Sequence, residues 1–281
     1  MDLIRLACST GVYNGIPLAD TIRRLARIGY AAVEICAEHN ELAASEDTLQ
    51  TAKPLKEALV RYNISVANIA ATSVNLCEKK APGSGIWVSQ EHIERIKYYA
   101  RLARELNCDS LTVNPGRPIQ DAREGSQLSC LMAALKEITK FARGLGVAIG
   151  VVYGPSLILQ NATDVQALFT KVRGLKLAFN TANSHLACET PCVVVTELKH
   201  RIKHVHLADV GSSNRAYLIP GEGEIEWISF FRTLHWIGYK EFVTVDLSSY
   251  ADMPDLAAKR AFFYLSNLLN AYKQPRGKGV A

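Results

Sequence analysis

The hydrophobic positions of the chain form a repeating pattern of amphipathic helices and short apolar runs. Leu18, Ile22 and Leu25 recur at intervals of three or four residues, which places them on one face of a helix. Gly29 follows that helix and precedes an apolar run over residues 31–35. Glycine and asparagine enter the left-handed conformation at little cost, so such a residue ends a helix and leads into a strand. The same joint recurs at Asn63, Asn107, Gly146, Gly174 and Gly238.

The apolar runs predict eight β-strands. Their centres lie near residues 5, 33, 66, 111, 149, 177, 204 and 243, with room for a helix between successive runs. The runs are apolar nearly throughout rather than alternating, as expected for parallel strands buried on both faces. Eight strand–helix units in one chain of this length predict α/β architecture, a single (β/α)8 TIM barrel over residues 1–272. An open doubly wound sheet is disfavoured because no glycine-rich nucleotide-binding motif follows the first run.

The composition is typical of a soluble globular protein. The 281 residues are 48% hydrophobic and 21% charged, which excludes a disordered chain. No segment approaches the ~18 uninterrupted apolar residues of a membrane helix. Asp2 and Arg5 occupy positions where a signal peptide would have its apolar segment. We therefore expect a cytoplasmic protein without a membrane partner.

The net charge of +5 is concentrated at the end of the chain. Lys273, Arg276 and Lys278 lie within residues 273–281, which we predict to form a basic flexible tail. Without these three residues the remainder has a net charge of +2, so we expect no nucleic-acid partner. The seven cysteines are scattered through apolar segments without a Cys-x-x-Cys motif, which is typical of buried free thiols.

In a barrel of this kind, functional residues follow the C-terminal ends of the strands. At those ends the sequence has Tyr153 after the fifth run, Asn180 and Asn183 after the sixth, His206 in the seventh and Asp246 after the eighth. The acid at 246 directly follows a buried Val-Thr-Val run, where a solvated acid is unusual. We predict that Asp246 and His206 point into the site.

Three segments carry a resemblance to a known family. They are His204–Asp209 with the sequence His-Val-His-Leu-Ala-Asp, the Pro-Gly-Glu-Gly loop at Pro220–Gly223, and the Gly-Tyr-x-x-Val-Glu joint at Gly29–Glu34. In this order and spacing the chain resembles, over roughly residues 3–270, the xylose-isomerase-like sugar phosphate isomerase/epimerase TIM barrels. That group includes ketose 3-epimerases, hydroxypyruvate isomerase, inosose isomerases and dehydratases and, more distantly, endonuclease IV-type AP endonucleases. The resemblance implies a small polyhydroxylated carbohydrate as the substrate.

The resemblance also implies one divalent ion, held by Glu, Asp, His and Glu from the ends of the last four strands. The corresponding residues here are Val152, Asn180, His206 and Asp246, and a further family histidine falls on Asn183. Divalent ions prefer several anionic oxygens, so the loss of two carboxylates should remove most of the affinity. We therefore predict a degenerate metal site and no cofactor. The alternative is weak Mn, Mg or Co binding at His206, Asp246 and Asn180.

These substitutions also change the expected chemistry. Val152 cannot accept a proton, which disfavours an epimerisation with two opposed bases. A reaction with Asp246 as the base and His206 as the acid or hydrogen-bond donor is the interpretation we adopt. His204 shares the alternation of its strand, and it either lines the barrel or packs in the core.

Seven further side chains are candidates for substrate binding: Asn180, Asn183, His185, Arg215, Glu222, Trp87 and Tyr153. Arg215 is a candidate clamp for a phosphate or carboxylate. Trp87 ends a predicted flap over residues 82–87 that would cover a ligand.

Two functions remain open on the sequence. The first is a sugar isomerase, epimerase or lyase that acts on a small polyhydroxylated carbohydrate or keto-sugar without a tightly bound metal. The second is a non-catalytic homologue, either a sugar-binding protein or the inactive partner subunit of an active paralogue. An endonuclease is excluded because that class needs more His and acidic ligands than the chain offers. A homo-oligomer, or a heteromer with an active paralogue, is compatible with either function.

Overall fold

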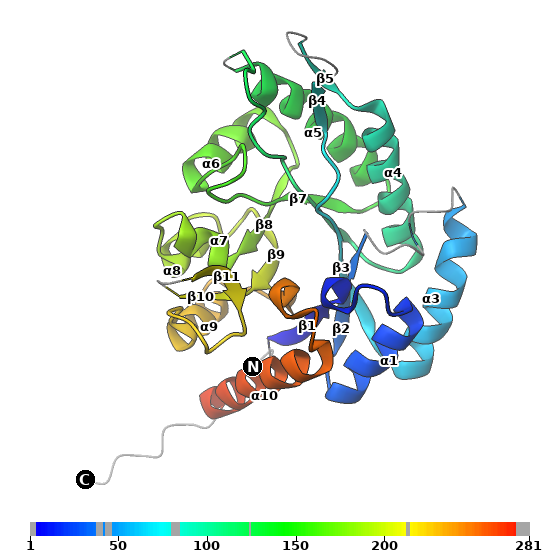
Figure 1. Cartoon of the computed structure of the whole chain (residues 1–281), viewed down its shortest axis with the longest axis vertical. Helices are drawn as coiled ribbons and strands as arrows, with labels where there is room; N and C mark the ends of the chain where they lie inside the picture. The colour runs from blue at the N-terminus through cyan, green and yellow to red at the C-terminus, as the bar shows by residue number, and fades with distance from the viewer. Residues whose placement is uncertain are drawn as a thin grey trace.

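The computed structural model describes residues 4–37, 42, 47–79, 85–123, 125–211 and 214–273. Within them, eight parallel strands close into a barrel in the spatial order β1-β12-β9-β8-β7-β6-β3-β2. Helices surround the strands, as Figure 1 shows. The predicted (β/α)8 barrel is therefore confirmed. The predicted tail lies outside the described part of the chain from residue 274 onward.

Each predicted strand centre falls within one barrel strand. In chain order the barrel strands are β1 (Arg5–Ser9), β2 (Ala32–Cys36), β3 (Ser65–Ala71), β6 (Ser110–Val113), β7 (Ala148–Val151), β8 (Lys176–Asn180), β9 (Ile202–Leu207) and β12 (Phe242–Val245). Most of their residues are buried, because one face points into the barrel and the other packs against helices.

The helices alternate with these strands along the chain. They are α1 (Leu18–Ile28), α3 (Thr48–Tyr62), α4 (Gln90–Glu105), α5 (Ser126–Gly144), α6 (Ala162–Lys171), α7 (Thr181–Leu186), α8 (Pro191–Glu197), α9 (Trp227–Trp236) and α10 (Pro254–Lys273), with short 3-10 turns η1 (Thr10–Tyr13) and η2 (Ser248–Tyr250). The joint residues adopt the left-handed conformation, with φ of 117° at Gly29 and 49° at Asn63. A Cβ at Gly29 would also lie 2.6 Å from the Phe262 ring, so α10 packs directly on this joint. None of the described helices is long and apolar enough to cross a membrane.

Two short hairpins extend the loops at the C-terminal end of the barrel. They are β4 (Cys77–Lys79) with β5 (Ile86–Val88), and β10 (Asp209–Gly211) with β11 (Asn214–Leu218). The sequence analysis did not predict them. Tyr217 of β11 lines the cavity described below, whereas no described residue of β4 or β5 does so.

The inside of the barrel is unusually polar. Glu34 of β2, Asn68 of β3, Thr112 of β6, and His204 and His206 of β9 are all buried. Barrel interiors are normally filled with branched apolar side chains. A buried polar cluster of this kind must satisfy its own hydrogen bonds, and it marks the part of the molecule where chemistry is to be sought.

Candidate functional site

A cavity of about 520 Å³ opens at the C-terminal ends of the barrel strands. All eight strands, or the segments that follow them, contribute to its wall. Its acidic, basic and histidine side chains are Glu34, Arg117, His206 and Asp246. The remaining polar wall consists of serine, threonine, asparagine and tyrosine residues. This size and mixed polarity suit a small ligand rich in hydroxyl groups.

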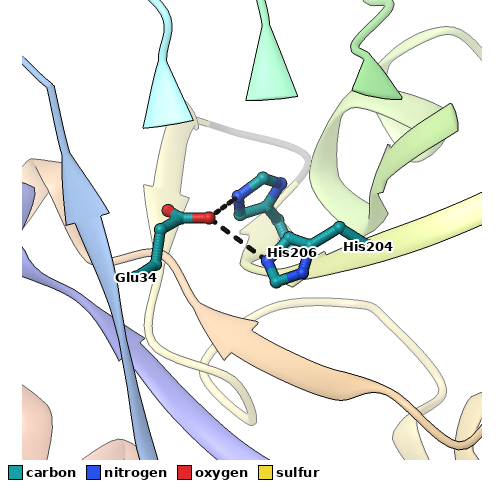
Figure 2. Close-up of side chains that lie close together, drawn as sticks. All are labelled: Glu34, His204 and His206. Carbon is teal, nitrogen blue, oxygen red and sulfur yellow. Dashed lines mark hydrogen bonds and ion pairs between the residues drawn. The ribbon is translucent and has the colours of Figure 1, made fainter. Parts of the chain in front are cut away.

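The shortest contact between charged groups in the cavity wall joins Glu34 and His206. The Nε2 atom of His206 lies 2.6 Å from Oε2 of Glu34, and both residues are buried. β2 and β9 are not neighbours in the sheet, so this pair spans the interior of the barrel. Figure 2 shows the imidazoles of His204 and His206 turned toward the same carboxylate.

The Glu34 carboxylate is held on a second side by a neutral chain of hydrogen bonds. Nδ2 of Asn68 donates to Oε2 of Glu34 at 2.7 Å and contacts Oγ1 of Thr112 at 2.9 Å. These residues come from β2, β3 and β6, which are successive strands of the barrel. The carboxylate therefore has a fixed position and orientation before any ligand arrives.

His204 lies beneath the pair rather than in the cavity wall. Its Nε2 atom is 3.2 Å from Oε2 of Glu34, and its ring meets the His206 ring edge-on at 4.8 Å between centroids. The side chain is 1% exposed. Of the two roles that the sequence left open, the structure therefore places His204 in the core, against the functional pair.

The electrostatics of the cluster separate the two histidines. Burial acts to lower the pKa of His206, but the Glu34 carboxylate outweighs it and raises that pKa above its ordinary value. Burial lowers the pKa of His204, where the same carboxylate compensates less. Burial would raise the pKa of Glu34, yet the two imidazoles hold it well below its usual range. These pKa shifts favour the ionised form of Glu34, the protonated form of His206 and the neutral form of His204.

Asp246 lines the same cavity directly after β12. Its Oδ1 accepts a hydrogen bond from the backbone N–H of Ser248 at 3.2 Å, and the Ser248 side chain also bonds the carboxylate. Burial raises its pKa, an effect that His206 opposes and Glu34 reinforces. A carboxylate with few donors and a raised pKa is suited to accept a proton from a ligand.

The neighbouring wall, formed by the segments after β7 and β8, is neutral. Asn180 accepts from the backbone N–H of Asn183 at 3.0 Å, and thereby starts α7. Nδ2 of Asn183 donates to the Tyr153 carbonyl at 2.7 Å, and Oδ1 of Asn183 accepts from the Tyr217 hydroxyl at 2.6 Å. Asn183 therefore positions the wall, whereas the Nδ2 atom of Asn180 has no hydrogen-bond partner among the described residues and lies at the cavity.

The residues at the positions of the family's metal ligands include fewer carboxylates than the family resemblance implies. Val152 packs with Leu157 and Ala178 in an apolar patch where a carboxylate would be needed. Nε2 of His206 and Oε2 of Glu34 are 2.6 Å apart, whereas two ligands bound ~2.1 Å from one ion are separated by about 3 Å or more. These two atoms are therefore at hydrogen-bond distance, although Glu34, His204 and His206 together form a buried group whose ligand atoms all lie within 4.8 Å of one another and that could hold a metal ion.

Several predicted substrate-binding side chains lie away from this cavity. Glu222 bonds the Tyr250 hydroxyl at 2.9 Å and pairs with Arg260. His185 faces Glu224 at 3.7 Å in a separate depression beside α8. Tyr153 is buried with its hydroxyl on Glu189, and Trp87 is 56% exposed on β5. The side chain of Arg215 lies outside the described part of the chain.

Two charged residues of the cavity were missed by the sequence analysis. Glu34 was quoted as part of the Gly29–Glu34 joint, but it was not assigned to the site. A carboxylate inside a buried strand is rare unless paired, and that rule could have identified it. Arg117 follows β6 in a loop without a motif, and no pattern distinguishes it from a surface arginine.

Comparison with known proteins agrees with the fold. Residues 22–266 match the family model described as xylose isomerase-like TIM barrel. Fructoselysine 3-epimerase from Escherichia coli O157:H7 is 20% identical over 262 residues, which cover 89% of this chain and 92% of that protein.

Two solved structures show the same architecture at low identity. The IOLI protein with a binding zinc atom has a TM-score of 0.79 at 16% identity, and the alignment covers 97% of this chain and 100% of that chain. The probable 3-DHS dehydratase AsbF from Bacillus anthracis has a TM-score of 0.77 at 13% identity, with 94% and 99% covered.

Proposed function

Since this chain belongs to the xylose isomerase-like TIM barrel family, we propose that it catalyses proton transfer on a small polyhydroxylated carbohydrate or keto-sugar without a tightly bound metal. The observation that carries the proposal is the buried Glu34–His206 ion pair, 2.6 Å long, in the same cavity as Asp246. A relative named fructoselysine 3-epimerase supports a carbohydrate as the ligand class.

The two halves of the reaction fall to different groups. The Asp246 carboxylate takes the proton from the carbon next to a substrate carbonyl, and negative charge then develops on the carbonyl oxygen. His206 carries a positive charge because Glu34 stabilises its protonated form. The Nδ1 atom of His206 has no hydrogen-bond partner among the described residues, so its N–H is available to that oxygen. A fixed positive donor at a developing oxyanion is an effective form of transition-state stabilisation.

The chain offers one base and not two. The wall after β7 has Val152 in an apolar patch, and residues 144–160 contain no carboxylate at all. A single base returns the proton to the face of the substrate from which it came. This favours transfer to the adjacent carbon, as in an aldose–ketose isomerisation, or elimination of water from the next carbon, over inversion at one centre.

The proposal is tested by proton exchange in D2O. Protein treated with EDTA is incubated with D-fructose, D-tagatose and D-fructose 6-phosphate, and 1H NMR follows the hydrogens on the carbons next to the carbonyl. We expect exchange with at least one of these ketoses, and a rate at least about 100-fold lower in Asp246→Asn. His206→Ala should reduce the rate in the same way because the oxyanion loses its donor.

The matched control is Asp252→Asn, an exposed acid in the segment between η2 and α10, which should exchange at the wild-type rate. Exchange that appears only after Mn²⁺ is added would overturn the metal-free mechanism. A ketose that binds without any exchange would overturn catalysis and favour the non-catalytic homologue.

A further inference from the structure

One charged side chain in the cavity wall is not used by the proton transfer. Arg117 lies in the loop between β6 and α5 and lines the cavity. Its guanidinium has no ion pair, hydrogen bond or aromatic ring as a partner among the described residues. Apart from His206, it is the only cationic side chain in the described cavity wall. His206 is already neutralised by Glu34, so Arg117 is the uncompensated positive charge of the site.

The backbone that carries Arg117 is held rigidly. Nε2 of Gln127 donates to the Arg117 carbonyl at 2.7 Å, and Oε1 of Gln127 accepts from the N–H of Ile119 at 2.9 Å. The preceding Gly116 has φ of 91° and donates to Oδ1 of Asn114 at 2.9 Å. The backbone is therefore fixed on both sides of Arg117. A ligand that binds the guanidinium has to order only the Arg117 side chain and not the loop, which lowers the entropic cost of binding.

Barrel topology places this loop opposite the base. β6 and β12 are separated by four steps around the closed sheet in either direction, so Arg117 and Asp246 extend from opposite sides of the barrel mouth. A hydrogen bond of 2.9 Å from the N–H of Ile158 to the Gly116 carbonyl ties the loop after β7 to the Arg117 loop. The loop after β7 contains Ser156, which also lines the cavity, so this loop lies next to the Arg117 loop.

We propose that Arg117 forms an anion subsite, and that the substrate carries a phosphate or a carboxylate at the end remote from its reacting carbon. This inference rests on the proposed function, since it identifies the substrate class of the same cavity. The guanidinium fork matches the oxygens of either anion, and neighbouring hydroxyls such as Ser156 complete the hydrogen bonding. An anionic group avoids Asp246 and binds Arg117, which turns the other end of the ligand toward the base. Arg117 thus takes the clamp role that the sequence analysis gave to Arg215.

The test is a comparison of ligands by isothermal titration calorimetry. D-Fructose 6-phosphate and D-glucuronate represent the two anions, and D-fructose is the neutral ligand. We expect Arg117→Met to weaken binding of the preferred anion by about 10- to 100-fold, as for the loss of a charge-assisted hydrogen bond, with D-fructose unaffected. Arg117→Lys should retain part of the affinity, because the charge remains without the fork.

Arg123→Met is the control, because Arg123 is an exposed arginine near the same loop and does not line the cavity. It should bind every ligand like the wild type. The inference is overturned if Arg117→Met binds the anions as well as the wild type does, or if no anion binds the wild type at millimolar concentration. Binding by Asp246→Asn separates the two proposals: this variant should keep the anion preference even if proton exchange is never observed.

Discussion

Two aspartates at neighbouring strand ends of this barrel have opposite surroundings. Asp209 follows β9 and is fully buried, with hydrogen bonds from the backbone of Gly221 at 2.8 Å and of Ile225 at 3.1 Å, and from Nε1 of Trp227 at 2.8 Å. Asp246 follows β12, the adjacent strand, and its carboxylate is bonded only by Ser248 among the described residues, through the backbone N–H at 3.2 Å and through the side chain. The number of donors that the fold supplies, rather than residue type or position, separates an acid that builds the loop from an acid that can react.

The region around Asp209 is tightly packed. Gly223 packs against the Asp209 carboxylate and the Val210 backbone, which a Cβ at position 223 would overlap. The Pro-Gly-Glu-Gly loop at Pro220–Gly223 is thus a structural element anchored by the last residue of the His-Val-His-Leu-Ala-Asp motif. This explains why Glu222 bonds Tyr250 and Arg260 instead of lining the cavity.

The largest effect on the free energy of unfolding is expected when the Asp209 carboxylate, which anchors the loop, is removed. Asp209→Ala leaves four donors without an acceptor, namely the backbone N–H groups of Val210, Gly221 and Ile225 and Nε1 of Trp227. Each buried donor left unsatisfied costs about 1–3 kcal/mol. We expect the free energy of unfolding to fall by about 4 kcal/mol in urea titrations followed by circular dichroism. Asp209→Asn keeps one accepting oxygen and should lose about half as much. Asp252→Ala, at an exposed position, is the control, and a loss as small as in that control would show that Asp209 does not anchor the loop.

An intermediate effect is expected at Glu34, which belongs to both categories because it is fully bonded and also lines the cavity. Glu34→Gln removes the charge that pairs with His206, and a broken buried ion pair costs about 3 kcal/mol. The lowered pKa of Glu34 gives stability that is present above its ordinary value of 4.5 and lost as the pH falls. The raised pKa of His206 gives stability that is present below 6.5 and lost as the pH rises through the folded value.

The opposite pKa shifts of Glu34 and His206 together define the pH range in which the free energy of unfolding of Glu34→Gln differs most from that of the wild type. The difference in the free energy of unfolding should be greatest between pH 4.5 and 6.5 and should shrink on either side. Urea titrations across this range measure it. A difference that does not change with pH would mean that Glu34 and His206 do not form an ion pair in the folded protein.

The same contrast explains which features the sequence could predict. The eight strands were predictable because each is buried on both faces and leaves an apolar run, and six of these runs follow a Gly or Asn joint. His206, Asp246 and Asn180 were predictable because barrel topology brings strand ends to one rim. Glu34 was not, since its partner lies three strands away around the barrel, and no spacing along the chain encodes a contact across the interior. Arg117 was not, because only the closed barrel turns a loop arginine toward the cavity.

The smallest effect on stability is expected at Asp246, where the effect on the reaction is large. Burial raises the pKa of this carboxyl, so the folded state disfavours the charged form that the reaction needs. A raised folded pKa contributes stability that is fully present below the ordinary value of 3.8 and lost as the pH rises. Asp246→Asn removes this charge, and its amide oxygen can still accept from Ser248. At neutral pH the free energy of unfolding of the variant should therefore lie within about 1 kcal/mol of the wild-type value, on the more stable side. Lowering the pH should make the free energies of unfolding of the two proteins more similar, because the wild-type carboxyl then becomes neutral as well.

If Asp246→Asn were instead as destabilising as Asp209→Asn, Asp246 would be an anchor like its neighbour, and the distinction between the two strand ends would fail.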